Sequence, residues 1–462
     1  MIHTDENCES PPGGARCPGL SYVDLLGRDT RPVPAFLRAD RYRYLGSEPL
    51  DVDRYVNPDV FRAECEKMWP RVWQFAAREE ELPDPGDYVV YENAGRSYLV
   101  TRQPDGSVRA FYNVCLHRGR KLRTEDGCAV DFKCPFHAFT WEIDGSLKDI
   151  PCRWDFGHLT AEKMQLPQAT VARWGGYIFL REAEEGPGIE EYLDPLPREF
   201  ARWDHAGCAT TLWVGKVIAA NWKAVLEAFI EAWHSLETHK QLLPFTGDAN
   251  SAYHVLGEHV NLAITPFATP SPHLDQGVAS DRWLAERLAE YNARPGDPVV
   301  PIELADGQSA REAVAELNRR MFQQQCGYDY TEASDAEMLD AFVYNVFPNF
   351  SPWGGHMPNI VYRFRPWPDH RATLMEVRFL RKIPAGEAHP RCPPMRLLGP
   401  GEGFAAVEAL GQLGGVFDQD MWNLPQVQAG CEASKTGKIE LGNYQEVRIR
   451  HFAQTMDHYL AG

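Results

Sequence analysis

Two pairs of cysteine and histidine lie close together in the first third of the chain. Cys115 and His117 are two residues apart, Cys134 and His137 are three apart, and sixteen residues separate the pairs. Thiolates and imidazoles are the side chains that hold zinc and iron in proteins. The spacing therefore predicts a metal site built from two short loops, each of which supplies one sulfur and one nitrogen.

The pairing of unlike residues separates two kinds of metal site. A structural zinc ion accepts two thiolates and two imidazoles, but zinc modules usually pair Cys with Cys and His with His. A Rieske [2Fe–2S] cluster needs two Cys on one iron and two His on the other. Two facing loops with one Cys and one His each meet that need, so the cluster is our preferred interpretation. Zinc, and four unrelated core residues, are the alternatives.

A second candidate site lies in residues 221–240, NWKAVLEAFIEAWHSLETHK. Its apolar residues follow a 3.6-residue period and predict a helix. Glu227, Glu231 and His234 form a stripe on the opposite side, which by itself is typical of a solvated face. His239 follows His234 by five residues, about 140° further round an ideal helix. Both can bind one ion only if the helix ends or bulges between them.

These segments resemble the Rieske non-haem iron oxygenases, the large (alpha) subunits of ring-hydroxylating dioxygenases and related monooxygenases. The matching stretches are NVCLHRG and CPFH at the first site and the Asn-Trp-Lys segment at the second. The resemblance covers approximately residues 45–430. It implies that Cys115 and Cys134 hold one iron of the cluster and that His117 and His137 hold the other.

The chain departs from the family just after its last cluster His. The sequence reads HAFTW, where the family more often has a Gly-Trp pair. Ala138 and Phe139 therefore bear on the packing and hydrogen bonds that tune the potential of the cluster, and not on its ligation.

The same resemblance implies a mononuclear Fe(II) held by two His and one carboxylate, with coordination positions left open for O₂. His234 and His239 match the two His. The third ligand is expected in residues 414–430, GGVFDQDMWNLPQVQAG, where the family register selects Asp420. Asp418 is the alternative, and capping of a helix N-terminus is the non-metal interpretation of either.

Two further residues receive roles from the resemblance. Glu231 lies three residues before His234, a helical spacing that lets its carboxylate accept a hydrogen bond from that imidazole. In the family this carboxylate also meets the outer cluster His of the neighbouring subunit, here His137. Asn221 matches a polar residue that the family places near the iron.

The elements that must position these residues predict an α+β chain. We expect an N-terminal arm over residues 1–45, a Rieske domain with a preceding helix over 46–185, and a catalytic domain over 186–462. From Gly86 to about Arg181, short alternating runs broken by turn signals predict a small antiparallel β domain. The resemblance implies that the catalytic domain is an antiparallel sheet flanked by helices, of the helix-grip type.

Three shorter segments carry expectations of their own. NPDVFRAECEKMWP predicts a helix with Asn57 as its N-cap and Pro70 as its stop. Phe347 and Phe350 in YNVFPNFSP are expected in the core. Residues 240–340 match no part of the resemblance, and long connections of this kind form lids or binding loops.

Composition limits the partners. The 47 Lys and Arg against 65 Asp and Glu give a net charge of −18, which argues against nucleic acid as a partner. No stretch approaches the roughly 20 apolar residues of a membrane span, and the N-terminus has no apolar signal region, so a cytoplasmic protein is expected. Most of the eleven scattered Cys are expected to be reduced, buried thiols. One local basic patch consists of Arg118, Arg120, Lys121 and Arg123. It suits docking of an acidic electron donor. The alternative is that these side chains pair with Glu125 and Asp126 on the same loop.

The function implied is that of a terminal oxygenase. It would use O₂, and electrons from NAD(P)H delivered through a flavoprotein reductase or ferredoxin, to hydroxylate an aromatic or other small hydrophobic substrate. We favour a dioxygenase over a monooxygenase. The alternatives are a monooxygenase acting as an O- or N-demethylase or on a quaternary amine, and a Rieske protein that only transfers electrons. The expected assembly is a homotrimer, or an α₃β₃ complex with small β subunits.

Overall fold

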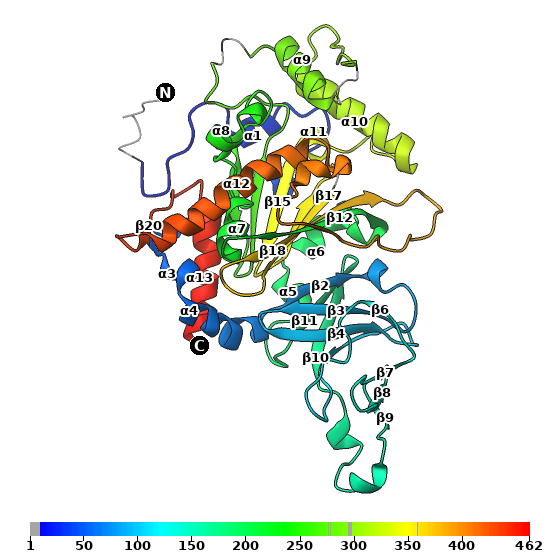
Figure 1. Cartoon of the computed structure of the whole chain (residues 1–462). Helices are drawn as coiled ribbons and strands as arrows, with labels where there is room; N and C mark the ends of the chain where they lie inside the picture. Colours follow the sequence, from blue (N-terminus) through cyan, green and yellow to red (C-terminus); the bar gives the residue numbers. More distant parts are fainter. Residues whose placement is uncertain (1–9, 276, 278, 294–297, 358) are drawn as a thin grey trace.

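The computed structural model contains two β-rich bodies joined end to end (Figure 1). Strands from residues 74–181 form the smaller body, and a sheet from residues 208–398 forms the larger one. The α+β class predicted from the sequence is confirmed. The structure describes residues 10–275, 277, 279–293, 298–357 and 359–462.

A seven-stranded antiparallel sheet makes up most of the smaller body. Two tight turns of this body contain a glycine: Gly106 and Gly145 adopt positive φ and donate to the carbonyls of Gln103 and Glu142. Glycine takes this conformation without steric cost. In spatial order the strands are β2 (Gln74–Arg78), β11 (Tyr177–Arg181), β10 (Gln168–Trp174), β5 (Val108–Tyr112), β4 (Arg96–Arg102), β3 (Asp87–Asn93) and β6 (Gly127–Cys128).

A separate small sheet lies at the far tip of this body. It is antiparallel and consists of β7 (Asp131–Lys133), β8 (Thr140–Glu142) and β9 (Leu147–Asp149). Phe132 and Trp141 are fully buried beneath it, and the indole N–H of Trp141 donates to the carbonyl of Met164 at 2.6 Å. This packing gives the loops of the tip a rigid base.

The larger body is built on an eight-stranded sheet. Neighbouring strands are antiparallel except β19, which pairs in parallel with β12 at one edge. In spatial order they are β13 (Ala252–Val255), β14 (Val260–Thr265), β15 (Ala341–Val346), β16 (Ser351–Gly354), β17 (Asn359–Pro366), β18 (Thr373–Lys382), β12 (Cys208–Ile218) and β19 (Arg396–Leu398). Two short strands, β1 (Leu50–Asp51) and β20 (Lys438–Ile439), pair outside it.

The two faces of the large sheet have different neighbours. Helices α7 (Trp222–Ala228), α12 (Gln412–Glu432) and α13 (Val447–Ala461) pack on one face (Figure 1). On the opposite face, alternate side chains of β15 meet the ring of Phe200 and the indole of Trp203. The face under the helices is the one that carries the second candidate site.

The remaining helices lie at the periphery or between the bodies. They are α1 (Tyr22–Leu26), α2 (Ala35–Arg38), α3 (Asp53–Val56), α4 (Pro58–Ala63), α5 (Ile189–Tyr192), α6 (Leu196–Glu199), α8 (Ser235–Thr238), α9 (Asp281–Asn292), α10 (Ala310–Cys326) and α11 (Asp335–Leu339). Asn57 caps α4 as predicted, accepting from the N–H of Asp59 at 2.9 Å. The helix continues past α4 as a π turn over Glu64–Met68, which places the Glu64 carboxylate 2.5 Å from Nζ of Lys223.

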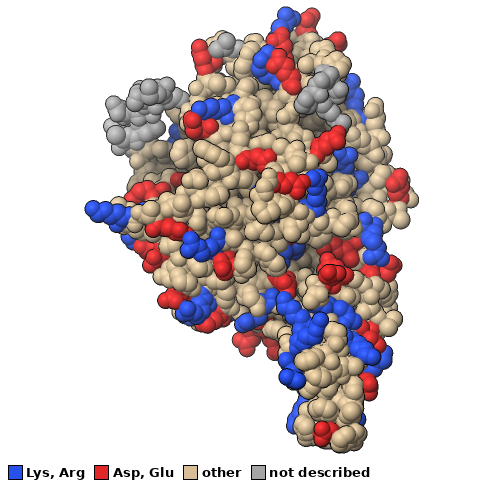
Figure 2. Space-filling model, in the orientation of Figure 1, with Lys and Arg blue, Asp and Glu red and all other residues tan. Residues whose placement is uncertain are grey.

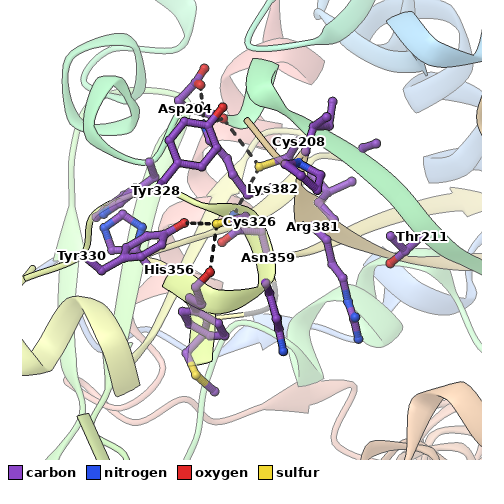
Figure 3. Close-up of a pocket in the computed structure, with 18 of the residues that line it drawn as sticks. Asp204, Cys208, Thr211, Cys326, Tyr328, Tyr330, His356, Asn359, Arg381 and Lys382 are labelled. Carbon is purple, nitrogen blue, oxygen red and sulfur yellow. Dashed lines mark hydrogen bonds and ion pairs between the residues drawn. The ribbon is translucent and has the colours of Figure 1, made fainter. Parts of the chain in front are cut away.

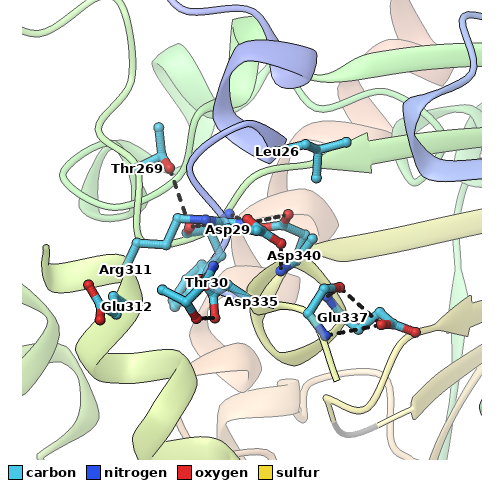
Figure 4. A network of polar contacts seen from close by, with 12 residues as sticks. Leu26, Asp29, Thr30, Thr269, Arg311, Glu312, Asp335, Glu337 and Asp340 are labelled. Atoms are coloured by element: carbon cyan, nitrogen blue, oxygen red, sulfur yellow. Dashed lines mark hydrogen bonds and ion pairs between the residues drawn. The ribbon is translucent and has the colours of Figure 1, made fainter. Parts of the chain in front are cut away.

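The N-terminal arm is anchored on the larger body through a polar network (Figure 4). The backbone N–H of Thr30 donates to Asp335, and the hydroxyl of Tyr22 donates to Asp340, each bond 2.8–2.9 Å long. Asp340 in turn forms an ion pair with Arg311 of α10 at 2.7 Å. The arm therefore takes its order from this packing.

Buried arginines join the two bodies. Glu376 on β18 accepts from Arg363 and Arg365 at 2.6–2.9 Å, and it has no exposed surface. The same guanidinium groups extend to backbone carbonyls of the smaller body, at Phe75 and Glu92. Phe347 and Phe350 are buried in the core, as predicted.

Within the described residues ten cysteines are free thiols, and only Cys115, Cys134, Cys208 and Cys326 are buried, so the expectation that most of them are buried is wrong. A search of the same residues finds no helix with the length and apolar character of a membrane span.

Candidate metal centres

Two loops at the tip of the smaller body have the same construction. The first follows β5, and the second joins β7 to β8. The N–H of Cys115 donates to the carbonyl of Arg120 at 2.8 Å, and the N–H of Cys134 donates to the carbonyl of Phe139 at 2.8 Å. Each loop is thus closed between its Cys and the residue five positions later, which fixes the direction in which Cys and His project.

Each loop turns at the fourth residue after its Cys. Gly119 has φ +78° and Ala138 has φ +62°. A residue with a Cβ pays roughly 1–2 kcal/mol for this conformation, whereas Gly does not. The departure from the family at Ala138 therefore keeps the turn at an energetic cost.

The four predicted cluster ligands face one another. Cys115 and Cys134 are buried, and the rings of His117 and His137 have centroids 4.7 Å apart. Burial raises the pKa of the Cys115 thiol, the backbone N–H of His117 lowers it, and the adjacent Cys134 sulfur raises it. Nδ1 of both imidazoles is buried with no hydrogen-bond partner in the described structure. Two adjacent thiols and two orphaned ring nitrogens form a donor set that fits a two-iron cluster.

One edge of this site is open to solvent. Phe139 stacks on the His117 ring with centroids 4.5 Å apart, on the inner side. On the outer side Phe136 is 56% exposed, beside His137, and the Arg118 guanidinium lies 5.2 Å from the centre of its ring. A partner molecule can therefore approach the His end of the site directly.

The surface around this tip is basic. Lys and Arg side chains gather on the lower part of the molecule in Figure 2. Arg118 and Arg120 are exposed and, within the described residues, have no carboxylate at ion-pair distance. Lys121 pairs with Glu92, and Asp126 accepts from the backbone N–H of Val90. The internal pairing with Glu125 and Asp126, considered as an alternative, is not observed.

The predicted helix over 221–240 is broken in the middle. α7 ends at Ala228, and the four-residue α8 begins only at Ser235. His234 immediately precedes α8 and His239 immediately follows it, so the condition that the helix must end or bulge is met. Glu231 lies in the break, not on the continuous helical stripe expected from the sequence.

The break brings two imidazoles and a distant carboxylate together. Nε2 of His234 and Nε2 of His239 are 3.1 Å apart, and Oδ1 of Asp420 lies 3.1 Å from His239 Nε2 and 3.7 Å from His234 Nε2. These three atoms come from residues up to 186 positions apart in the chain. They face one point, as the ligands of a single ion do.

The partners of the other ring nitrogens show which atoms carry protons. Nδ1 of His234 is hydrogen-bonded to the Glu231 carboxylate, and Nδ1 of His239 lies 2.8 Å from Oε1 of Gln419. Both partners are acceptors, so both Nδ1 atoms are donors, and in the neutral imidazoles, the form that binds metals, both Nε2 atoms present lone pairs. Three acceptors converging without a donor repel one another unless a cation lies between them. The donor set therefore fits a divalent metal, with its His ligands oriented from behind.

Asp418 and Asp420 have different environments on α12. The Asp418 carboxylate accepts from the backbone N–H groups of Phe404 and Ala405 at 2.6 and 3.0 Å. Asp420 instead joins the two imidazoles. The geometry thus favours Asp420 over Asp418 as the third donor.

Asn221 has a structural position. Its side chain caps α7 by accepting from the N–H of Lys223, and its amide donates to the carbonyls of Tyr55 and His370 at 3.0 and 2.8 Å. None of these partners belongs to the triad of His234, His239 and Asp420. In this structure the Asn221 side chain therefore serves as the N-cap of α7, and its catalytic placement near the iron stays a prediction.

Aromatic side chains line the sheet beside the triad. The ring of Tyr362 on β17 lies 5.0 Å from Phe229 and 6.2 Å from Phe417. Burial and the nearby Asp420 carboxylate raise the pKa of the Tyr362 hydroxyl. This wall is apolar except for that hydroxyl.

Gln419, which orients His239, was not found from the sequence. No motif marks it, because its role depends on contact with a residue 180 positions away. Its position beside Asp420 was the only available signal.

A pocket of about 1090 Å³ lies elsewhere, near the end of β18 and beside α10 (Figure 3). Cys208, Cys326 and Tyr330 line it, and none of the predicted ligands does. It is separate from both candidate metal centres.

The fold and the two donor sets together define a protein of the Rieske type that carries a second, two-His-one-carboxylate site. A family model described as Rieske [2Fe-2S] domain matches residues 72–160, and one described as ring hydroxylating alpha subunit (catalytic domain) matches residues 198–462. The second match covers more than half of the chain. The chain belongs to the ring-hydroxylating alpha subunit family, whose cofactors are a Rieske cluster and a mononuclear iron.

Curated relatives fall into two functional groups. The glycine betaine monooxygenase oxygenase subunit of Chromohalobacter salexigens is 30% identical over 234 residues, 48% of this chain and 51% of the relative. The large oxygenase component of the naphthalene 1,2-dioxygenase system of Pseudomonas putida is 35% identical over 193 residues, 40% and 43% of the two chains. The chain thus spans about half the length of the curated relatives it matches.

Solved structures from both groups share the fold. The quaternary ammonium Rieske monooxygenase CntA with L-carnitine has a TM-score of 0.61 at 17% identity, covering 89% of this chain and 95% of that one. Naphthalene 1,2-dioxygenase with indole has a TM-score of 0.62 at 18% identity, covering 90% and 92%. At such identity the likeness concerns the fold alone.

Proposed function

We propose that the protein is a terminal oxygenase, which uses O₂ and electrons from a separate donor to hydroxylate a small hydrophobic organic molecule. The observation that carries this proposal is the convergence of His234, His239 and Asp420 in a chain that also holds a cluster-type donor set. An electron-transfer protein has no need of the second site.

The two donor sets support a ligand assignment. Cys115 and Cys134 would hold one iron of the cluster, and His117 and His137 would hold the other through their orphaned Nδ1 atoms. His234, His239 and Asp420 would hold the mononuclear Fe(II), which would supply the chemistry that activates O₂.

The protein side chains orient and shield this centre. Glu231 and Gln419 accept from the Nδ1 atoms and keep both Nε2 lone pairs aimed at the ion. Phe229, Tyr362 and Phe417 exclude water from the sheet side and offer flat surfaces to a substrate. The Tyr362 hydroxyl is the polar group of this wall.

We propose that electrons pass between subunits. In Figure 1 strands β7 to β9 lie in the lower part of the molecule, whereas α8 and α12 lie in the upper part. A head-to-tail ring would bring His137 of one chain to Glu231 of the next, beside His234. One solved relative is described in terms of inter-subunit electron transfer. We therefore propose a homotrimer, alone or with β subunits.

The donor of electrons would dock at the basic tip. Arg118 and Arg120 lie there without carboxylate partners in the described residues, so an acidic ferredoxin or reductase would be attracted to the His end of the cluster. NAD(P)H would be the ultimate source.

Two substrate classes suit the aromatic wall. An arene would stack on Phe229, Tyr362 or Phe417, and ring dioxygenation is our first candidate reaction. A quaternary ammonium group would instead make cation–π contacts, and the resulting monooxygenation is the second candidate. It is favoured by the similarity to glycine betaine and carnitine monooxygenases.

Metal analysis tests the assignment. Anaerobically purified protein should contain about three irons per chain, two of them with acid-labile sulfide and one removable by a chelator. Only two irons, both in the cluster, would support the electron-transfer alternative. A colourless protein without sulfide would support zinc.

Mixed trimers test the electron path. A Cys115→Ala chain lacks the cluster and an Asp420→Ala chain lacks the mononuclear iron, so each homotrimer should be inactive. Trimers assembled from equal amounts should regain about a quarter of wild-type turnover, because each junction draws its two subunits independently. No recovery would rule out transfer across the boundary. Products from a panel of arenes and betaines would then decide the substrate class.

A further inference from the structure

Arg448 is a buried cation whose three hydrogen-bond partners are all uncharged. It lies in the first turn of α13 and has no exposed surface. Its guanidinium donates to the carbonyl of Ile230 at 2.9 Å, to the carbonyl of Val343 at 2.7 Å and to Oδ1 of Asn261 at 2.6 Å. No carboxylate of the described residues lies within ion-pair distance. Burying an unpaired charge is costly, so this position calls for an explanation.

One of these partners is the carbonyl that the broken helix leaves without a donor. In a continuous helix, the N–H of His234 would donate to the carbonyl of Ile230, four residues earlier. In the structure this N–H donates to Oε2 of Glu231 at 3.2 Å. The Ile230 carbonyl accepts from Arg448 in its place.

A second backbone group in the break, the N–H of Ala232, also has a side-chain partner in place of a helical one. The N–H of Ala232 would donate to the carbonyl of Ala228 in a continuous helix. It donates instead to the hydroxyl of Tyr253 at 3.1 Å, and Tyr253 is fully buried. Two side chains from other elements thus replace two missing helical hydrogen bonds.

The break they stabilise positions the candidate iron site. It places Glu231 against His234, and it allows His234 and His239 to meet although their spacing forbids this on one helix. Buried backbone groups without partners cost about 1–3 kcal/mol each, so without Arg448 and Tyr253 the continuous helix would become a competitor.

We propose that Arg448, supported by Tyr253, is a positioning residue that holds the break between α7 and α8 in the geometry required for iron binding and electron entry. The proposal rests on the proposed function for the role of Glu231 and His234. Its structural part, the stabilisation of the break, concerns the metal-free chain as well.

The test uses three variants of the full-length protein and one matched control. Arg448→Met removes the donors, Arg448→Lys keeps the charge and at most one contact, and Tyr253→Phe removes only the hydroxyl. Arg450→Met is the control, because Arg450 is on the same helix, is 4% exposed and donates to the carbonyl of Glu48, away from the break.

Amide hydrogen exchange of the metal-free proteins is the first readout. Peptides covering residues 229–239 should exchange at least about tenfold faster in Arg448→Met and Tyr253→Phe than in wild type. Arg450→Met should leave them unchanged. Equal exchange in wild type, Tyr253→Phe and Arg448→Met would overturn the proposal.

The second readout is the affinity for cobalt(II). It is measured from the d–d absorption of the bound ion, in protein from which the mononuclear iron has been removed. Arg448→Met should bind cobalt(II) about 10–100-fold more weakly than wild type, as is common when a residue that orients a metal ligand is replaced. The affinity of Arg448→Lys should lie between those of Arg448→Met and wild type. The EPR spectrum of the reduced cluster should stay unchanged. If Arg448→Met does not fold, Tyr253→Phe decides, and unchanged exchange and affinity there would overturn the proposal.

The outcomes separate this inference from the function itself. Wild-type protein without a mononuclear iron would contradict the proposed function, and hydrogen exchange would still test whether Arg448 stabilises the break. If wild type is active but Arg448→Met equals Arg450→Met in exchange and in cobalt affinity, only the role of Arg448 is contradicted.

Discussion

Glu231 accepts two hydrogen bonds from His234, one from its backbone N–H at 3.2 Å and one from Nδ1 of its imidazole. Both the main chain and the ring of His234 are thus oriented by a single carboxylate. The Glu231 side chain is largely buried, whereas the His234 side chain is 26% exposed. The imidazole of this pair can therefore be reached from solvent.

The first prediction concerns Glu231→Gln. The amide oxygen can still accept from His234, but the charge that attracts a second imidazole is gone. Turnover should fall about 10–100-fold, while iron content and the cluster spectrum stay at wild-type values. Steady-state product formation and EPR of the reduced protein measure these. Unchanged turnover would remove Glu231 from the electron path.

The second prediction separates the two aspartates of α12. Asp420→Ala should lose the chelatable iron and keep the two cluster irons, because one of three ligands is missing. Asp418→Ala should keep every iron and lose about 1 kcal/mol of stability, since two backbone N–H groups lose their acceptor. Iron and sulfide analysis with thermal unfolding distinguishes them, and the reverse pattern would assign the ligand to Asp418.

The third prediction concerns the junction of the two bodies. Burial acts to raise the pKa of Glu376, but Arg363 and Arg365 outweigh burial and lower the pKa well below its usual value. Glu376→Gln leaves these guanidinium groups without a buried counter-charge. Unfolding free energy should fall by about 3–5 kcal/mol. Chemical denaturation measures it, with Glu408→Gln at an exposed position as a control expected to show no measurable change.

The fourth prediction concerns pH. Burial raises the pKa of Asp29 from 3.8 to about 6, Arg311 and the N–H of Ala336 oppose this, and the carboxylates of Asp340 and Asp335 add to it. The folded protein therefore holds a proton that the unfolded chain has released between pH about 4 and 6. Stability contributed by this proton is present at the lower end and lost as pH rises to about 6.

Asp29→Asn tests this sign. The side chain of this variant cannot ionise. Its unfolding free energy relative to wild type should therefore rise by on the order of 2 kcal/mol as pH rises from 4 to 7. Melting temperatures across this range measure the difference. A constant difference between the two proteins would show that Asp29 does not titrate in this window.

Short-range spacing was enough to predict the cluster loops. Cys115, His117, Cys134 and His137 lie within 23 residues, and each Cys–His pair shares one tight loop. Local backbone geometry, closed by one hydrogen bond per loop, then largely determines how the donors project. The turn signals of the smaller body are local in the same way, as at Gly106 and Gly145.

The second site was predictable only in its residue types. Periodicity indicated a continuous helix through Glu227, Glu231 and His234, and the structure breaks it after Ala228. The break is stabilised by Arg448 and Tyr253, which lie on other elements. The contacts of Asn221 were not predictable for a related reason, since a motif does not reveal that a side chain caps a helix and donates to two distant carbonyls.

The sequence by itself thus determined which donors exist, the kind of metal each set suits, the α+β class and the two-part order of the chain. These depend on residue identity and on contacts within a few turns. The family register had selected Asp420 and the spacing had paired Glu231 with His234, but the tertiary structure alone decided how close Asp420 comes to the two imidazoles. It alone decided that Gln419 orients His239 and that a guanidinium more than 200 residues away supports the break. Such relationships require distant segments to pack together, and no local pattern along the chain encodes the resulting distances.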